Sequence, residues 1–293
     1  MAMRTDERRR GIGQMRHRQL SIVMVLAAGS VCVQAQWLKH PAAGTPRAKN
    51  GTPNLLAPAP RLASGRPDLS GVWQAEPAPL EILLKIFPDS ENGTQALGES
   101  PGSPYFGNIL GDFKPGEITM QPWAEALLKE RMATNSKDIP SSKCLPLGVP
   151  LSDAAVFPHK IIQTPGVVVV LYEDLTTFRQ IFTDGRKLPV DPQPALMGYS
   201  VGRWEKDWLV VEVAGFQDRG WLDASGHPFS DAMRVTERFH RRDFGHLDVQ
   251  VTIDDPKTYS KPFTFKFTKL LLPDTDLLES YCENEKDAPR LLG

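Results

Sequence analysis

Apolar and polar residues alternate along the second half of the chain with the two-residue period of a β-strand. The clearest example runs from His246 to Ile253, where four aliphatic residues alternate with polar ones. A later segment, residues 263–268, places three phenylalanines on one face and Thr, Lys and Thr on the other. Each such segment predicts a strand with one face in a core and one face in water. The predicted strands are residues 160–163, 167–173, 177–183, 199–205, 208–216, 234–241, 246–253 and 263–268.

Short turns separate several of these strands. Lys206-Asp207 fits a two-residue hairpin turn, and residues 243–245 form another short connection. Closely spaced strands with hairpin turns and little helix are typical of a closed barrel or a sandwich. We therefore expect an all-β fold of antiparallel strands closed into a barrel, with a β-sandwich as the alternative.

The first half of the chain lacks this alternation. Prolines and glycines interrupt residues 76–122, and residues 140–158 are equally irregular. Between them, Trp123 to Met132 consists of strong helix formers and follows Pro122, which suits the first position of a helix. We expect an irregular, partly helical N-terminal layer packed against the strands.

The N-terminus has the layout of a secretory signal peptide. The arginines at 8–10 precede an apolar run from Leu20 to Val33, and Ala35 offers a small residue for cleavage. The apolar run of about 14 residues is shorter than the ~20 that a membrane-spanning helix needs. We expect a signal peptide over 1–35, a disordered tether over 36–66 that is rich in Pro, Ala and Gly, and a single β-rich domain over 67–293. The mature protein is then periplasmic or secreted, with no membrane attachment after cleavage.

Composition narrows the classes of partner. The formal net charge is -1, and no basic stripe interleaved with aromatic residues follows the N-terminus. Nucleic acid is therefore not an expected partner. If Cys32 leaves with the signal, Cys144 and Cys282 remain, and an oxidising compartment favours a disulfide between them. The sequence does not fix an oligomeric state.

Two stretches resemble known proteins. Gly71-Val72-Trp73, at the start of the predicted domain, resembles the G-x-W motif of lipocalin-type calycin barrels. This resemblance implies a calycin-like or lipocalin-like barrel.

A second set of motifs resembles an uncharacterised family of secreted bacterial proteins. The likeness covers most of the chain after residue 66 and implies secretion, but it carries no activity with it. The motifs are P-D-L-S-G-V-W at 67–73, C-L-P-L-G-V-P at 144–150, D-G-R at 184–186, G-R-W-E at 202–205 and W-L-D-x-x-G-H-P-x-S-D at 221–231.

The segment from Trp221 to Asp231 is the leading candidate for a functional site. Asp223, His227 and Asp231 recur at intervals of four, so one helical turn or a tight loop would bring them together. A histidine oriented by a carboxylate is a common general acid–base unit. The alternative is a structural loop in which Gly226 and Pro228 set the turn, while Asp231 and Ser230 cap neighbouring backbone groups.

Further residues extend this candidate site. Arg203 and Arg238 are candidates to stabilise developing negative charge. Glu212 interrupts an otherwise apolar strand, which predicts either an internal Glu–Arg pair or a proton-handling carboxylate inside the barrel. Trp204, Trp208 and Trp221 suggest an aromatic wall for an apolar or ring-shaped ligand.

No metal or cofactor site is predicted. His246 would join His227 and Asp231 as a two-histidine, one-carboxylate set, but no metal-binding motif supports it. His159, next to a predicted strand, is interpreted as a loop residue or a residue at a pocket mouth.

Three functions stay open on this basis. The first is an exported barrel that binds a small apolar or aromatic molecule. The second is a hydrolase or lyase that uses His227 for acid–base chemistry, with Asp231 or Asp223 orienting it. The third is a structural secreted protein without a ligand.

Overall fold

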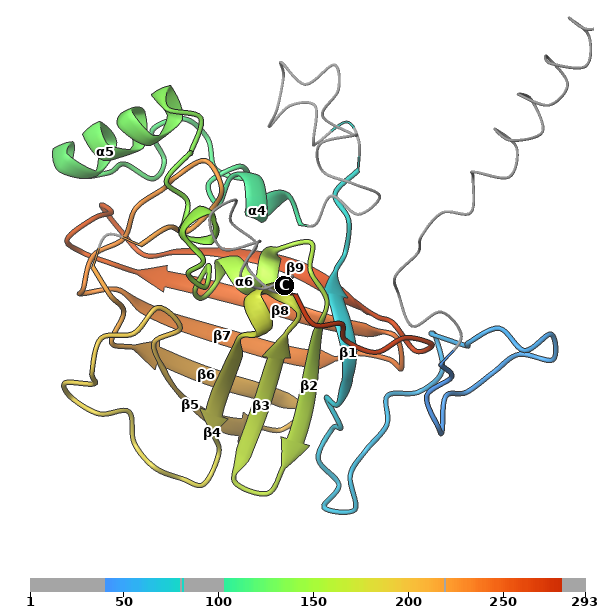
Figure 1. Cartoon of the computed structure of the whole chain (residues 1–293). Helices are drawn as coiled ribbons and strands as arrows, with labels where there is room; N and C mark the ends of the chain where they lie inside the picture. The colour runs from blue at the N-terminus through green and yellow to red at the C-terminus, as the bar shows by residue number, and fades with distance from the viewer. Residues whose placement is uncertain (1–39, 80, 82–102, 219, 281–293) are drawn as a thin grey trace, which may run out of the picture. The chain divides into compact units, whose positions relative to one another are not determined.

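A computed structural model describes residues 40–79, 81, 103–218 and 220–280 (Figure 1). Nine strands close into one barrel in which each strand pairs with its neighbour in the sequence and β1 pairs with β9. The expected all-β barrel is thus confirmed. The strands are β1 Gly71–Ala75, β2 His159–Thr164, β3 Val167–Tyr172, β4 Phe178–Phe182, β5 Tyr199–Glu205, β6 Trp208–Ala214, β7 Arg234–Arg241, β8 His246–Asp254 and β9 Phe263–Leu271.

One strand pairing differs from the expected antiparallel pattern. β4 and β5 run parallel and share two residue pairs, Ile181 with Ser200 and Phe182 with Val201. The physical reason is the connection over residues 183–198, which leaves the end of β4 and turns back, so that the first residues of β5 lie beside the last residues of β4 and run in the same direction. A hairpin turn cannot make such a return, whereas a long connection can.

The two ends of the barrel are built differently. The long connection from β1 to β2 holds α4 Pro104–Gly107, α5 Pro122–Ala133, the 3₁₀ turn Pro140–Lys143 and α6 Leu151–Ala154 at one end, here called the helix-covered end (Figure 1). The expected helix after Pro122 is α5. The opposite end carries the turns β2–β3, β5–β6 and β7–β8 and is called the hairpin end. The remaining 3₁₀ turn is Asp174–Thr176. Within the described ranges no helix has the length and apolar character to cross a bilayer.

Alternate residues of each strand fill the barrel interior. β8 buries its four aliphatic residues as the alternation predicts, and β9 turns its phenylalanines inward. At the hairpin end Trp73 is fully buried, and the guanidinium of Arg241 lies 4.8 Å from the centre of its ring. The described interior is therefore a packed core for much of its length.

Residues 40–66, for which a disordered tether is expected, differ from that expectation. The Ala42 N–H donates to the Pro273 carbonyl at 2.9 Å, and the Gly245 N–H donates to the Leu55 carbonyl at 2.7 Å. Arg61 pairs with Asp207 of the β5–β6 turn at 2.7 Å. Backbone hydrogen bonds of this kind need no apolar periodicity, so composition does not reveal them.

The remaining N-terminal and cysteine predictions are untested. The chain divides into residues 1–38 and 39–293, and the predicted signal peptide lies outside the described residues. Cys144 follows the 3₁₀ turn Pro140–Lys143, whereas Cys282 is outside the described residues. The Cys144–Cys282 disulfide stays a prediction.

Candidate functional site

The Trp221–Asp231 loop brings Asp223 and His227 together. His227 Nδ1 lies 2.5 Å from Asp223 Oδ2, and the Asp223 side chain is fully buried. The same carboxylate accepts the backbone N–H groups of Ile109, Gly226 and His227 at 2.7, 2.9 and 3.1 Å. Within the described residues His227 Nε2 makes no hydrogen bond. An imidazole held by a carboxylate through Nδ1, with Nε2 available, has the arrangement of an oriented base.

Asp231 does not join this pair. Its side chain is 62% exposed and accepts a hydrogen bond from Lys257 Nζ at 2.7 Å. Gly226 turns the chain with a φ of 102°, and Trp221 bridges back to Pro228. The segment is thus a tight loop, so residues four apart share no helical face and only one of the two expected contacts forms.

The other predicted polar residues lie elsewhere. Arg203 and Arg238 both pair with Glu205 near the β5–β6 turn, at the hairpin end, whereas the Trp221–Asp231 loop joins β6 to β7 at the helix-covered end. Glu212 is not inside the barrel. Its side chain is 47% exposed and pairs with Arg203 Nη1 at 2.6 Å on the outer face. The apolar residues on both sides of Glu212 in β6 concealed which face it occupies.

The three tryptophans do not form one wall. Trp204 is partly buried against the core at the hairpin end. Trp208 lies on the outer face, stacked on His240 with 4.7 Å between ring centres. Trp221 is buried with Leu147 and Leu151 at the helix-covered end.

A cluster of buried polar residues occupies the helix-covered half of the lumen. Its members come from α6 and from six strands, and each is at most 4% exposed. The lumen cluster consists of Asp153, His159, Tyr172, Arg179, Ser200, Glu237 and Lys269.

Arg179 organises one side of the lumen cluster. Its guanidinium donates to both carboxylate oxygens of Glu237, to Ser200 Oγ at 3.0 Å and to Asp153 Oδ2 at 3.4 Å. The bidentate pair fixes two charges that would otherwise be costly to bury.

Lys269 organises the other side. Its ammonium donates to Asp153 Oδ1 and, over 2.9 Å, to His159 Nε2. The Tyr172 hydroxyl donates to Asp153 Oδ2 at 3.2 Å, so one carboxylate links the two halves. His159 Nδ1 is buried and makes no hydrogen bond of good geometry among the described residues, although the nearby Phe157 carbonyl favours a proton on it.

Burial and neighbouring charges shift the pKa values of this cluster. Burial, reinforced by the charge of Lys269, lowers the pKa of His159 to about 3. Burial would raise the pKa of Asp153, but Lys269, Arg179 and His159 hold it at about 2. Burial raises the pKa of Glu237 and lowers that of Lys269, each opposed by its ion-pair partner. Groups with such shifts concentrate at functional sites.

Aromatic rings adjoin the Lys269 ammonium. The ring centres of Phe239 and Phe267 lie 5.7 and 5.9 Å from Nζ. Phe267 in turn lies 6.4 Å from Tyr105 of α4 and 6.2 Å from Phe265. These inward rings, not the tryptophans, form the aromatic surface of this half of the lumen.

The sequence contained a signal for this cluster. Lys269 lies an even number of residues after Phe263, Phe265 and Phe267 on the same strand, and Glu237 lies two residues after Val235. Alternation along a strand therefore places both charged side chains on the inward face. Charged residues on the apolar face of a strand mark a buried polar site. Asp153 offered no such signal, because it enters the lumen from a short helix in an irregular region.

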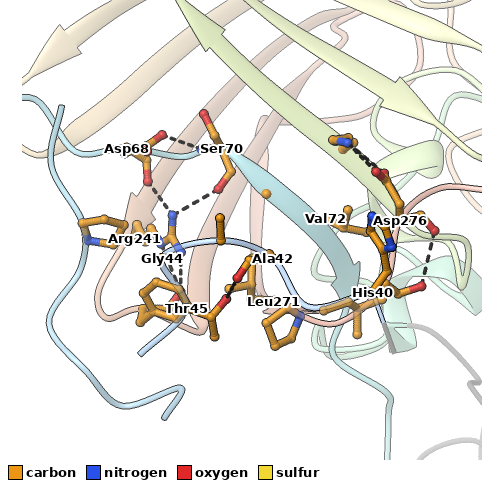
Figure 2. Close-up of a pocket in the computed structure, with 18 residues that line it drawn as sticks. His40, Ala42, Gly44, Thr45, Asp68, Ser70, Val72, Arg241, Leu271 and Asp276 are labelled. Carbon is orange, nitrogen blue, oxygen red and sulfur yellow. Dashed lines mark hydrogen bonds and ion pairs between the residues drawn. The ribbon is translucent and has the colours of Figure 1, made fainter. Parts of the chain in front are cut away.

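Two hollows lined by described residues lie outside the lumen. One, of about 470 Å³ at the hairpin end, is lined by the 40–45 segment, the start of β1 and Arg241 (Figure 2). Arg241 donates to the carbonyls of Asp68 and Ser70 at 2.7 and 3.2 Å, and burial lowers its pKa to about 10. A second hollow, of about 480 Å³, lies between α5 and the residues before Leu222, with Arg131 and Trp221 in its wall.

The described residues contain no group of three or more His, Cys, Asp or Glu side chains placed to hold a metal ion. His246 pairs with Asp243 at 2.7 Å, apart from His227. No protein-family model matches the chain, and no curated protein matches it either.

Proposed function

We propose that this chain is an exported barrel that binds an uncharged small molecule with an aromatic or apolar body in the helix-covered half of its lumen. The observation that carries the proposal is the Lys269 ammonium, which is fully buried against aromatic rings and keeps an N–H donor that no described residue accepts.

The energetic cost of the lumen cluster supports a role beyond packing. Two carboxylates and two cations are buried there, and each buried ion costs several kcal/mol before its partners compensate. Apolar residues of similar volume often fill such a space with equal or greater stability. Polar groups that converge within an apolar surface are what a ligand site requires.

The number of N–H groups on Lys269 supports a ligand with a hydrogen-bond acceptor. An ammonium has three N–H groups. Asp153 and His159 accept two of them. The third is available to a carbonyl or hydroxyl oxygen, and such a bond in a dry site is worth more than in water.

The charge balance of the cluster supports an uncharged ligand. The carboxylates of Asp153 and Glu237 are matched by the cations Arg179 and Lys269, so the formal sum is zero. A ligand carboxylate or amine would add a buried charge without a partner, which is strongly unfavourable. A neutral acceptor group adds none.

Phe267 supports an aromatic or apolar ligand body. It faces inward next to Lys269 along β9, yet it is only partly buried. β1 ends at Ala75, opposite Lys269, and the Glu76 N–H still donates to the Thr268 carbonyl at 2.8 Å; among the described residues no strand pairs with β9 on that side before Lys269. The ring is therefore available to contact a ligand that reaches the ammonium.

Thermal unfolding with three matched compounds tests this proposal. We expect 4-methoxybenzyl alcohol to raise the melting temperature in proportion to its occupancy. The corresponding benzoate and benzylamine, which carry a charge, should have little effect. Phe267→Ala should weaken binding of the alcohol about tenfold, since a lost aromatic contact costs roughly 1.4 kcal/mol.

Lys266→Ala provides the matched control, because Lys266 lies on the same strand with its side chain exposed on the outer face. The control should bind the alcohol like the unmodified protein. Equal stabilisation by all three compounds, or a loss in Lys266→Ala as large as in Phe267→Ala, contradicts the proposed site.

Export is part of the proposal and rests on the N-terminal sequence. The arginines at 8–10, the apolar run to Val33 and the small residue Ala35 support cleavage before Gln36. N-terminal sequencing of protein from its native host should begin near Gln36. An intact N-terminus on cytoplasmic protein contradicts export.

The 2.5 Å contact between His227 and Asp223 supports a second candidate, a hydrolase or lyase that uses His227 Nε2 as a base. A panel of p-nitrophenyl esters provides a first assay. Any hydrolysis should be lost in His227→Gln and kept in Asp231→Asn, because Asp231 is remote from the pair. Activity that survives in His227→Gln removes this candidate.

A further inference from the structure

We propose that Lys269 forms a Schiff base with a ligand that carries an aldehyde or ketone group, and this inference rests on the proposed binding in the lumen. In this proposal the uncharged hydrogen-bond acceptor of the ligand is a carbonyl group, and this group also reacts covalently and reversibly with Lys269. The geometry points to it because one amine, one carboxylate and one imidazole meet beside aromatic rings.

The first requirement is an amine that loses its proton readily. A lysine in an apolar site is a better nucleophile because burial disfavours its charged form. Lys269 is fully buried between the rings of Phe239 and Phe267, and burial lowers its pKa although Asp153 opposes the shift.

The second requirement is a group that takes the proton. Lys269 Nζ already donates to His159 Nε2 over 2.9 Å. Transfer along this hydrogen bond gives a neutral amine and an imidazolium. It also removes the ammonium charge that helps to lower the pKa of His159, while the Asp153 charge that raises this pKa stays. The amine nitrogen then attacks the carbonyl carbon, a C–N bond forms as the C=O π bond breaks, and one proton moves from that nitrogen to the oxygen to give a neutral carbinolamine.

The third requirement is stabilisation of the cationic product. The carbinolamine loses its hydroxyl group as water, taking the proton from His159, and an iminium C=N⁺ remains on Lys269. Asp153 Oδ1, which accepts from Nζ in the free protein, lies beside that cation as its counter-ion. The charge on Nζ is the same before and after the reaction, so the neutral balance of the lumen cluster is kept.

Three other described lysines lack this combination. Lys257 is exposed and pairs with Asp231, which raises its pKa. Lys160 pairs with Asp276 at 2.8 Å on a partly exposed surface. Lys266 is exposed on the outer face of β9. Preferential labelling of Lys269 over these amines is therefore a test.

The experiment treats the whole protein with 4-methoxybenzaldehyde and sodium cyanoborohydride at pH 7, followed by intact mass and peptide mapping. We expect one reduced adduct per chain, on Lys269. Its labelling should be faster than that of Lys266, because burial lowers the pKa of Lys269 and so favours its neutral, nucleophilic form. Lys269→Met should lose the adduct and Lys266→Met should keep it.

Mapping of the unmodified protein decides the question even if Lys269→Met does not fold. Adducts spread over exposed lysines with Lys269 unlabelled overturn the inference. Stabilisation by 4-methoxybenzyl alcohol together with an unlabelled Lys269 overturns the Schiff base alone and leaves the proposed binding intact. Failure of both the alcohol to stabilise and the aldehyde to label Lys269 overturns the proposed function as well.

Discussion

Two Glu–Arg pairs of this barrel, one buried and one exposed, offer a matched test of how burial changes the contribution of an ion pair to the free energy of unfolding. Glu237 and Arg179 are buried in the lumen, with side chains 0% and 2% exposed. Glu212 and Arg203 form a similar pair on the outer face, with side chains 47% and 54% exposed. The same substitution, Glu→Gln, removes one carboxylate from each.

The expected losses differ by several kcal/mol. Glu237→Gln leaves the Arg179 guanidinium buried with less negative charge beside it, and breaking a buried pair typically costs about 3 to 5 kcal/mol. Glu212→Gln breaks a pair that water solvates, for which about 0 to 1 kcal/mol is usual. Because Gln keeps one acceptor and nearly the same volume, we place Glu237→Gln near ~3 kcal/mol.

Urea unfolding followed by tryptophan fluorescence measures both losses. With a slope of about 3 kcal/mol per molar urea, a loss of ~3 kcal/mol lowers the midpoint by about 1 M. The double variant Arg179→Met/Glu237→Leu should recover part of this loss, because it removes both charges. Equal midpoints for Glu237→Gln and Glu212→Gln refute the assignment of the lumen pair as buried and coupled.

Three further predictions concern acid stability, the site loop and the cysteines. The pKa of His159 falls from 6.5 to about 3 on folding, so the unfolded chain binds the extra proton and stability falls as pH drops from about 6.5 towards 3. His159→Gln should flatten this part of the urea-midpoint profile, and an unchanged slope counts against it. Gly226→Ala should cost roughly 1 to 3 kcal/mol, because φ is 102° and the new Cβ would lie 2.8 Å from Arg131 Cβ; a neutral result in urea unfolding contradicts the turn. Thiol titration of denatured, unreduced mature protein should find Cys144 and Cys282 unreactive, and two free thiols rule out the disulfide.

The strands were predictable because a strand with one buried face and one exposed face alternates apolar and polar residues along the sequence. The segment from His246 to Ile253 alternates strictly, and β8 buries the predicted face. The parallel pairing of β4 and β5 was not predictable, because residues 183–198 carry no pattern that shows to which end of the barrel they run. The order of residues 40–66 was missed for a related reason: their backbone hydrogen bonds leave no trace in side-chain type.

The candidate site was predicted in part. The Asp223–His227 contact follows from a spacing of four in a loop, whereas the same spacing failed for Asp231 because the loop ends its turn at Pro228. To predict the lumen cluster, one has to notice that some inward-facing positions of the strands hold charged residues. Lys269 and Glu237 carried that signal, and Glu212 attracted attention instead because its neighbours on both faces of β6 are apolar.

The most direct test of the central claim is the ammonium resonance of Lys269 in protein labelled with ¹⁵N-lysine. A buried ammonium held by Asp153 and His159 exchanges its protons slowly, and its signal is assigned by its absence in Lys269→Met. On titration with 4-methoxybenzyl alcohol, we expect this signal to shift with occupancy while the signals of the remaining lysines do not change. A ligand that raises the melting temperature and leaves the Lys269 resonance unchanged contradicts binding at the lumen cluster.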